Sequence, residues 1–441
     1  MTDGAARGPV TVLGFGLTGR AVCDHAIRHG VPVAVSDAGT LSSSAVAWLR
    51  DRGVPFEHGG HTDGFVRRAS VLVLSPGVSP GEPVVVSARQ RGVPVVSEIA
   101  YALSRGPECT VIAVSGTNGK SSTVTVIGEM LTTLGQRTWV AGNIGVPVIS
   151  IIDEVASGDV LCLEVSSYQL EQSPGFRPHI GVLLNLDPDH LHRHGSLERY
   201  ARAKSHLFAS QGPGDVAVLP RALAGTFDQG RGRRVYFDEA FPDLPSAADA
   251  LMPHERFNLR AALAACRAVV PTLDLAQVPM GRVTTALRLP HRMEALGFVE
   301  DIRVVNDSKS TNAASAIAAV RAVTSPSVLL LGGRSKGEGY EALADELERS
   351  DVRSVIVFGE AAAEFQAILS VRPSIAPRLH RVADLDEAVE RGLETARPGD
   401  VLLFSPACSS FDAFTDYVQR GEAFSAAIRR LPGFREVAPR T

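Results

Sequence analysis

A repeated alternation of two kinds of segment constrains the fold of this chain more than any other feature. Short Val/Leu-rich runs alternate with Ala-rich stretches almost throughout the sequence. Short apolar runs are typical of strands buried on both faces, and the stretches between them suit helices, so together they form βαβ units. We therefore predict an α/β fold built on parallel sheets. The predicted strands are Val10–Leu13, Val71–Leu74, Val111–Val114, Val160–Leu163, Gly181–Leu184, Ile302–Val305, Ser327–Leu331, Ser354–Phe358 and Val401–Phe404.

Chain length and two breaks containing proline predict how this fold is divided. A chain of 441 residues corresponds to about three domains at roughly 150 residues each. Breaks at Gly106-Pro107 and Leu289-Pro290-His291 mark the seams, so we predict domains at residues 1–105, 106–288 and 289–441. The polar segment 225–250 predicts a surface loop and an edge strand.

Composition excludes several classes of protein. Lys and Arg number 44 against 48 Asp and Glu, a net charge of −4, so no strong basic field indicates nucleic acid as the main partner. The five cysteines include no CxxC pair, which argues against a disulfide framework and a cysteine zinc site. No apolar run approaches the roughly 18 residues of a membrane-spanning helix, and the first residues lack the apolar core of a signal peptide. We expect a cytoplasmic protein.

A glycine-rich turn follows the first predicted strand and opens a helical segment. Its spacing is G-x-G-x-x-G, with glycines at Gly14, Gly16 and Gly19. In this context the glycines let the backbone approach a pyrophosphate, and the helix N-terminus supplies N–H donors. Asp37 closes the next predicted strand, Val33–Ser36, where an acid that contacts a ribose or base would sit. A tight turn without a ligand also satisfies these glycines, and the spacing does not say which nucleotide binds.

A second glycine-rich turn joins the strand at Val111–Val114 to a helix. It reads Gly116-Thr117-Asn118-Gly119-Lys120-Ser121-Ser122. Consecutive N–H groups in such a loop form a nest for anions, Lys120 suits the β- and γ-phosphates, and a following hydroxyl suits Mg²⁺. Val114 occupies the first glycine position of the full G-x-x-x-x-G-K-[ST] pattern, so the loop is a shortened variant of a nucleotide phosphate loop.

Acidic and histidine residues follow two other predicted strands. Glu164 ends an apolar run, where a carboxylate is costly unless it is paired or bound to a cation. An exposed or helix-capping carboxylate is the alternative, but beside a phosphate loop we predict metal ligation. The segment 187–194 carries two aspartates and three histidines, and Pro188 and Gly195 indicate a loop there. A loop disfavours a dedicated zinc site and leaves one imidazole linked to Mg²⁺ as the prediction.

These segments and several others together resemble the Mur ligase family, the ATP-dependent amide-forming enzymes of peptidoglycan precursor synthesis. The resemblance spans the chain, and its last motif is similar to the branch of the family that adds glutamate. The motifs are SPG at Ser75–Gly77, SGTNGKSS at 115–122, AGNIG around Asn143, LEVSSYQLE around Glu164, DHLHRHGSLERYARAK at Asp189–Lys204, HERFN at His254–Asn258, PHRME at Pro290–Glu294, NDSKSTN at Asn306–Asn312, LLLGGRSKG around Lys336 and SPACSSFDAFTDYVQRGEAF at 405–424.

The resemblance implies three domains and a reaction. The expected domains are a Rossmann-like N-terminal domain that binds UDP, a central P-loop ATPase-like domain, and a Rossmann-like C-terminal domain that closes over ATP and brings the amino acid. The first glycine-rich turn is therefore assigned to UDP rather than NAD. The expected substrates are ATP, UDP-N-acetylmuramoyl-L-alanine and glutamate, joined through an acyl phosphate with Mg²⁺ present. The D or L configuration of glutamate stays open, and we expect a monomer.

The resemblance also implies roles for individual residues. Four residues are expected to serve catalysis: Lys120, Glu164, His190 and Lys204. Glu164 with Ser121 or Ser122 would hold one Mg²⁺, and His190 would hold a second. Lys204 would also be a metal ligand if it is carbamylated like its family counterpart. The expected ATP-binding residues are Gly116, Thr117, Asn118, Gly119, Lys120, Ser121, Ser122, Asn258, Arg292, Asp307 and Lys309. The UDP-substrate residues are Gly14, Gly16, Leu17, Thr18, Asp37, Ser75 and Asn143, and the amino-acid residues are Thr311, Lys336, Ser410 and Tyr417.

Departures from the family pattern leave alternatives open. The family usually has threonine at Ser122, a small hydroxyl residue at Asp187, aspartate at His192 and asparagine at Glu255, and Glu255 puts the adenine-side contact of Asn258 in doubt. The nearest alternative is a sister Mur ligase or a folate polyglutamylating relative with another acceptor. An NAD-dependent oxidoreductase built on Gly14–Asp37, or an ATP-hydrolysing switch without ligation, would belong to another class.

Overall fold

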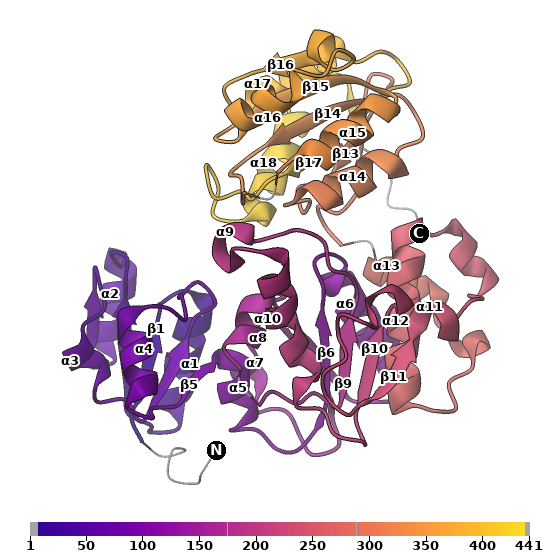
Figure 1. The fold of residues 1–441 in the computed structure, drawn as a ribbon. Coiled ribbons are helices and arrows are strands. Elements are labelled where there is room, and N and C mark those ends of the chain that lie inside the picture. Colours follow the sequence, from indigo (N-terminus) through magenta and orange to yellow (C-terminus); the bar gives the residue numbers. More distant parts are fainter. Residues whose placement is uncertain (1–7, 174, 288, 338, 437–441) are drawn as a thin grey trace. The chain divides into compact units, whose positions relative to one another are not determined.

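The computed structural model describes residues 8–173, 175–287, 289–337 and 339–436, and in this part the strands form three sheets (Figure 1). The chain divides into two compact units. The first unit comprises residues 1–185, 201–249 and 255–283, and the second comprises residues 186–200, 250–254 and 284–441. The nine listed strands and the strand predicted at Val33–Ser36 all coincide with observed strands, although several bounds differ by one to three residues. The α/β fold class is confirmed.

The first sheet is a five-stranded parallel sheet with the order β3-β2-β1-β4-β5. The central strands β1 and β4 are buried along their whole length, which explains their unbroken apolar sequence. The strands are β1 (Val10–Leu13), β2 (Val33–Asp37), β3 (Phe56–His58), β4 (Val71–Leu74) and β5 (Val95–Ser97). The helices are α1 (Leu17–Arg28), α2 (Ser43–Asp51), α3 (Asp63–Val66), α4 (Pro83–Gln90) and α5 (Glu98–Leu103).

The second sheet has six strands in the order β11-β10-β9-β6-β8-β7, all parallel. The predicted edge strand in segment 225–250 is confirmed as β11, and a short helix and a 3₁₀ turn follow it where the sequence suggested only loop. The strands are β6 (Thr110–Ser115), β7 (Thr138–Gly142), β8 (Val160–Glu164), β9 (Ile180–Leu183), β10 (Val216–Leu219) and β11 (Arg233–Tyr236). The helices along this part of the chain are α6 (Lys120–Thr133), α7 (Val148–Ile151), α8 (Ser167–Glu171), α9 (Leu191–His194), α10 (Leu197–Ala209), α11 (Phe237–Ala240), α12 (Pro253–Val269) and α13 (Met280–Leu287).

The third sheet departs from the predicted parallel arrangement at one edge. Its order is β16-β15-β14-β17-β13-β12-β18, and β12 runs antiparallel to both β13 and β18. Only Glu300 and Asp301 separate β12 from β13, and so short a connection cannot return the chain for a parallel pairing. The strands are β12 (Glu294–Val299), β13 (Ile302–Asn306), β14 (Ser327–Gly332), β15 (Val352–Phe358), β16 (Leu379–Arg381), β17 (Val401–Ala407) and β18 (Phe434–Glu436).

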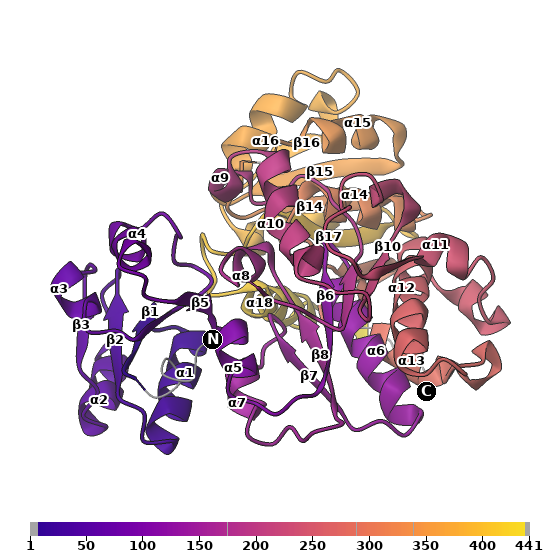
Figure 2. The same cartoon turned by 60° about the horizontal axis from the view of Figure 1, so that its bottom comes forward.

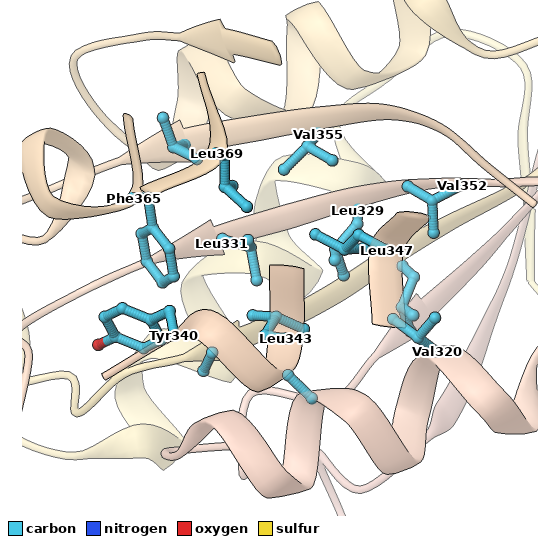
Figure 3. Packing of buried hydrophobic residues seen from close by; sticks show 14 of the residues in the cluster. Val320, Leu329, Leu331, Tyr340, Leu343, Leu347, Val352, Val355, Phe365 and Leu369 are labelled. Carbon is cyan, nitrogen blue, oxygen red and sulfur yellow. The ribbon is translucent and has the colours of Figure 1, made fainter. Parts of the chain in front are cut away.

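Helices cover the third sheet on two faces, and each face has its own apolar core. Alternate residues of β14 point to opposite faces: Leu329 and Leu331 pack into one cluster, Val328 and Leu330 into the other. Figure 3 shows the first cluster, where Phe365 of α16 lies near Tyr340 and the β14 leucines. The helices are α14 (Ala313–Ala322), α15 (Glu341–Arg349), α16 (Ala362–Leu369), α17 (Leu385–Thr395) and α18 (Tyr417–Arg429).

Buried polar contacts hold the first two sheets together within the first unit. The carboxylate of Glu98, at the start of α5, accepts a hydrogen bond from the backbone N–H of Ile149 on α7 at 2.6 Å. Glu98 is 2% exposed, and burial raises its pKa to about 7. The hydroxyls of Ser97 and Ser173 pair nearby at 2.5 Å. These contacts explain why residues on both sides of Gly106-Pro107 form one compact unit; the predicted domain boundaries themselves stay a prediction.

Candidate functional site

The first glycine-rich turn lies at the carboxyl end of β1, and its three glycines do different things. Gly14 has φ +86°, a value that only glycine adopts readily, and its carbonyl accepts a hydrogen bond from Ser75 Oγ at 2.8 Å. A Cβ on Gly19 would lie 2.0 Å from the Gly14 carbonyl oxygen, so the helix packs too closely for any side chain. A Cβ on Gly16 would meet no atom within 4 Å. Gly16 therefore keeps space open in front of the N-terminus of α1.

The remaining residues predicted for this end lie around the same turn. Asp37, at the end of β2, accepts hydrogen bonds from the backbone N–H groups of Phe15 at 2.6 Å and Gly39 at 2.8 Å. Its carboxylate therefore braces the turn. Leu17, at the first position of α1, is 66% exposed, and Thr18 follows it in the first helical turn. An apolar side chain held in solvent beside uncapped helix N–H groups is suited to covering a bound ligand.

The second glycine-rich turn, here called the 116–122 loop, leads from β6 into α6. Gly119 occupies the left-handed region at φ +84° and is the N-cap of α6, with no side chain capping the helix. The backbone N–H of Asn118 donates to Asn185 Oδ1 at 2.8 Å, and Asn185 Nδ2 donates to the Asn118 carbonyl at 3.1 Å. Asn185 thus clamps the loop from the segment after β9. Sequence reasoning missed it; its position directly behind a buried strand adjacent to β6 was the available signal.

Two lysines converge on the 116–122 loop. Lys120 Nζ donates to the carbonyl oxygens of Gly116 at 2.8 Å and Thr117 at 2.7 Å. Lys204 Nζ donates to the same Gly116 carbonyl at 2.9 Å and to Ser115 Oγ at 3.5 Å, and its side chain is 1% exposed. The side-chain nitrogens of both lysines therefore meet at one carbonyl oxygen of the loop.

Glu164, the last residue of β8, is a buried carboxylate beside this loop. It pairs in register with Val114 of β6, the strand that precedes the loop. Oε1 accepts a hydrogen bond from Asn143 Nδ2 at 2.9 Å, whereas Oε2 is buried without a hydrogen-bond partner in the described part of the chain. A buried, unpartnered carboxylate oxygen is costly, and a divalent cation is one group that would satisfy it. The donor set of Glu164 with the buried hydroxyl residues Ser121 and Ser122 fits Mg²⁺.

Asn143 and Asn258 were both predicted to contact ligands, and the structure gives each a protein partner. The amide of Asn143 holds Glu164, so this residue positions the carboxylate whatever else it contacts. Asn258, buried on α12, lies against the loop, since a Cβ on Gly119 would be 2.5 Å from Asn258 Oδ1. Asn258 is therefore brought to the phosphate loop, whereas its adenine-side role stays a prediction.

A second group of predicted residues gathers around Asp189 in the second unit. The buried Asp189 carboxylate accepts hydrogen bonds from Lys336 Nζ and Asn312 Nδ2, each at 3.1 Å, and from the backbone N–H of His190 at 2.8 Å. Burial works against ionisation, but Lys336, His190 and Asn312 outweigh it and lower the pKa of Asp189 to about 2. Lys336 also donates to Thr311 Oγ1 at 3.5 Å. Asp189 and Asn312 had no assigned role from the sequence. Asp189 nevertheless joins the predicted residues His190 and Lys336, and Lys336 in turn contacts Thr311.

Asp307 and its neighbours form the other polar group of the second unit. Asp307 accepts hydrogen bonds from the Met293 N–H at 3.1 Å and Ser405 Oγ at 2.8 Å. Burial raises its pKa to about 6, although the positive charge of Arg292 opposes the shift. Its assignment to a ribose hydroxyl stays a prediction.

The amino-acid residues predicted near the C-terminal motif are partly internal. Lys309 Nζ donates to the Tyr417 hydroxyl at 2.8 Å and lies 4.5 Å from the centre of its ring. Ser410 is buried. Arg420, which sequence reasoning missed, is wholly buried and donates to the Ser308 carbonyl at 2.8 Å, next to Lys309. Burial lowers the pKa of Arg420 to about 10. An arginine in a helix is ordinarily expected to face solvent. Nothing in the neighbouring sequence therefore indicated that Arg420 is buried against Ser308.

The four lysines of the chain are all among the predicted site residues: Lys120, Lys204, Lys309 and Lys336. Every other basic Lys/Arg position is an arginine, and none of the four lysines is exposed. Lysine differs from arginine in carrying one compact amine group in place of a planar guanidinium, and in this chain it occurs only at the predicted site positions.

A phosphate-binding type of loop on a parallel sheet, with a buried carboxylate at the next strand end, defines a nucleotide-dependent α/β enzyme. The comparisons with known proteins say which kind. Family models match the Mur ligase MurD-like N-terminal domain at residues 8–97, the Mur ligase middle domain at 114–227, and the Mur ligase glutamate ligase domain at 291–408. The chain belongs to the Mur ligase family, and the resemblance noted in the sequence is confirmed.

Curated relatives match nearly the whole chain. It is 36% identical to UDP-N-acetylmuramoylalanine–D-glutamate ligase of Desulfotalea psychrophila, covering 95% of each chain. It is 34% identical to the ligase of the same name from Pelotomaculum thermopropionicum, covering 96% of this chain and 98% of the relative. This family membership replaces the oxidoreductase hypothesis.

Solved structures share the fold at lower identity. The UDP-N-acetylmuramate–alanine ligase MurC of Thermotoga maritima matches with a TM-score of 0.57 and 19% identity, covering 96% of this chain and 99% of that one. The MurF ligase of Thermotoga maritima, solved in complex with ADP, matches with a TM-score of 0.56 and 17% identity, covering 98% and 100%. Among the described residues, no helix has the length and apolar character needed to cross a membrane.

Proposed function

We propose that this protein is an ATP-dependent ligase that joins D-glutamate to UDP-N-acetylmuramoyl-L-alanine in peptidoglycan precursor synthesis. The curated relatives bear the name of this ligase, and the chain matches them over nearly their whole length. Both facts support the proposed substrates. The structural observation that carries the proposal is the buried Glu164 carboxylate, with one unpartnered oxygen, at the strand end beside the 116–122 loop. Activation of a carboxyl group by ATP requires a cation site of this kind next to the phosphates.

The proposed reaction has two steps. The terminal L-alanine carboxylate attacks the γ-phosphorus of ATP, the bond to ADP breaks, and an acyl phosphate forms. The amine of glutamate then attacks the acyl carbon, loses a proton, and inorganic phosphate leaves with one oxygen of the former carboxylate. Both steps bring anionic groups together, so positive charge has to offset the repulsion. Lys120 and the N–H groups of the 116–122 loop supply it at the phosphates.

Mg²⁺ would be held by Glu164 with Ser121 or Ser122, and when bound it neutralises charge on the phosphate oxygens. Asn143 keeps the Glu164 carboxylate in place by donating to Oε1. His190 stays the proposed imidazole ligand of a second ion. Lys204 is proposed to be carbamylated: burial favours the neutral amine, and addition of CO₂ to a neutral amine produces a carboxylate suited to a metal.

The substrates are proposed to bind at the two ends of the chain. The N–H groups at the start of α1, with Gly16 leaving space and Leu17 exposed, suit the diphosphate and the uridine of the UDP substrate. Lys336 and Thr311, with Ser410 and Tyr417, are proposed for the two carboxylates of glutamate. Residues 1–105, 106–288 and 289–441 are proposed as the three domains, and the protein as a cytoplasmic monomer.

The test is ADP release in the presence of UDP-N-acetylmuramoyl-L-alanine and a panel of amino acids. We expect turnover with D-glutamate and little with L-glutamate, L-alanine or diaminopimelate. Lys120→Ala should abolish turnover, and Lys120→Arg, the matched variant that retains the charge, should restore little of it because a guanidinium does not fit two adjacent carbonyls. Full activity of Lys120→Ala, or ADP release without an amino acid, would overturn the proposal.

A further inference from the structure

Two histidines and an aspartate meet within the first unit, away from the residues assigned to the ligase reaction. His25 and His29 lie one turn apart at the C-terminal end of α1, and Asp153 follows α7, which packs against α1 (Figure 2). The glycine-rich turn is at the other end of the same twelve-residue helix, roughly 18 Å away at 1.5 Å per residue. The cluster is therefore separate from the nucleotide-binding end.

The distances within the cluster match those between ligands of one metal ion. Asp153 Oδ1 lies 3.3 Å from His25 Nε2 and 3.0 Å from His29 Nε2. All three atoms lie within 4.8 Å of one another, and the two imidazole rings stack with their centroids 4.3 Å apart. Ligands at about 2.0–2.1 Å from a tetrahedral Zn²⁺ are about 3.3 Å apart. The distances from Asp153 Oδ1 to the two histidine nitrogens are already close to this value.

The charged groups around the cluster affect how strongly it attracts a cation. Burial lowers the pKa of His25, against the opposing effect of Asp153. Burial favours the protonated form of Asp153, but the two histidines and Arg28 outweigh it and lower its pKa. Arg28 contacts Oδ2 at 3.3 Å, which leaves Oδ1 facing the imidazoles. The charges of Arg28 and Arg105 near the cluster weaken the attraction for a cation, so we expect moderate rather than tight binding.

We propose that His25, His29 and Asp153 form a Zn²⁺ site that bridges α1 to the segment after α7, with water as the fourth ligand. Two imidazoles with one carboxylate favour zinc and its transition-metal neighbours over Mg²⁺, which prefers oxygen ligands. Since α1 packs on the first sheet and α7 follows a strand of the second, the ion would link the two sheets of this unit.

The experiment is metal binding to the full-length protein after treatment with a chelator and dialysis. Zn²⁺ affinity is measured by competition with a chromogenic chelator, and Co²⁺ serves as the spectroscopic probe of coordination geometry. Millimolar Mg²⁺ is present throughout because it occupies oxygen-rich sites without competing for imidazoles. The variants are His29→Ala and Asp153→Asn, both at partly exposed side chains that the fold tolerates. His58→Ala, which removes an exposed imidazole of β3 in the first sheet, is the matched control.

We expect one equivalent of Zn²⁺, visible Co²⁺ bands of tetrahedral intensity, and a loss of affinity of roughly tenfold or more in both variants but not in the control. Circular dichroism in the absence of metal verifies that each variant is folded. Absence of saturable binding, a weak octahedral Co²⁺ spectrum, or equal affinity in all four proteins would overturn the proposal and leave a hydrogen-bonded cluster that binds only protons. None of these outcomes depends on whether the protein ligates glutamate.

Discussion

Replacement of Glu98 by glutamine should change how the stability of the protein depends on pH. The amide of Glu98→Gln retains the oxygen that accepts the Ile149 N–H, and it cannot ionise. In the wild-type protein, burial raises the pKa of Glu98 from its ordinary 4.5 to about 7. The stability that this raised pKa contributes is fully present below pH 4.5 and is lost as the pH rises through about 7. The variant does not undergo this loss.

The size of the effect follows from the two pKa values. At 1.36 kcal/mol for each pH unit between 4.5 and about 7, ionisation of Glu98 costs the folded state about 3 kcal/mol. Most of this loss appears between pH 4.5 and about pH 7. A domain of 150–250 residues shifts its melting temperature by roughly 2 °C for each kcal/mol, so the first unit should show a difference of about 6 °C.

The assay is thermal unfolding, followed by circular dichroism, at a series of pH values and constant ionic strength. The melting temperature of Glu98→Gln minus that of the wild type should rise between pH 4.5 and about pH 7 and then level off. Glu108→Gln, at an exposed glutamate ten residues further along the chain, is the control and should track the wild type. If the curves of Glu98→Gln and the wild type stay parallel, Glu98 is not buried against α7 as described.

Three further predictions concern the candidate site. Gly119→Ala places a Cβ 2.5 Å from Asn258 Oδ1 on a backbone with φ +84°. The resulting strain of about 1–2 kcal/mol should raise the KM for ATP roughly tenfold. An unchanged KM would contradict the loop geometry. Glu164→Gln should lower the rate of ADP formation roughly a hundredfold and shift the Mg²⁺ requirement upward, whereas Glu129→Gln, at a half-exposed glutamate of α6, should leave both unchanged. Lys336→Met leaves the Asp189 carboxylate buried without its ammonium and should destabilise the second unit by about 3–5 kcal/mol; a melting temperature equal to that of the wild type would show that the pair is not buried.

The parts of this molecule that the sequence predicts are those determined by neighbouring residues. Strands such as Val71–Leu74 are buried on both faces and read as continuous apolar runs, and the 116–122 loop is recognisable because its glycines and lysine are contiguous. Contacts across long stretches of chain were not predicted, because nothing local in the sequence identifies the partner. Asn185 is 67 residues from the Asn118 that it clamps, and Asp189 is 123 residues from Asn312.

The orientation of strands at the edge of the third sheet was also misjudged. The apolar character of Ile302–Asn306 identifies a buried strand but carries no information on the direction of its neighbour. That direction follows from the two-residue connection to Glu294–Val299. The sequence of this segment is not a continuous apolar run, so it was not predicted as a strand. Lysine usage was a signal available in the sequence, since lysine occurs only at positions assigned to the site.

That distribution has a practical consequence for labelling chemistry. Reagents that acylate side-chain amines find their targets only beside the phosphate loop and in the polar groups around Asp189 and Tyr417, where the ammonium groups are sheltered. Acylation of the two partly exposed lysines, Lys120 and Lys309, should therefore report ligand occupancy in a mass spectrum, without the background that surface amines produce in most enzymes.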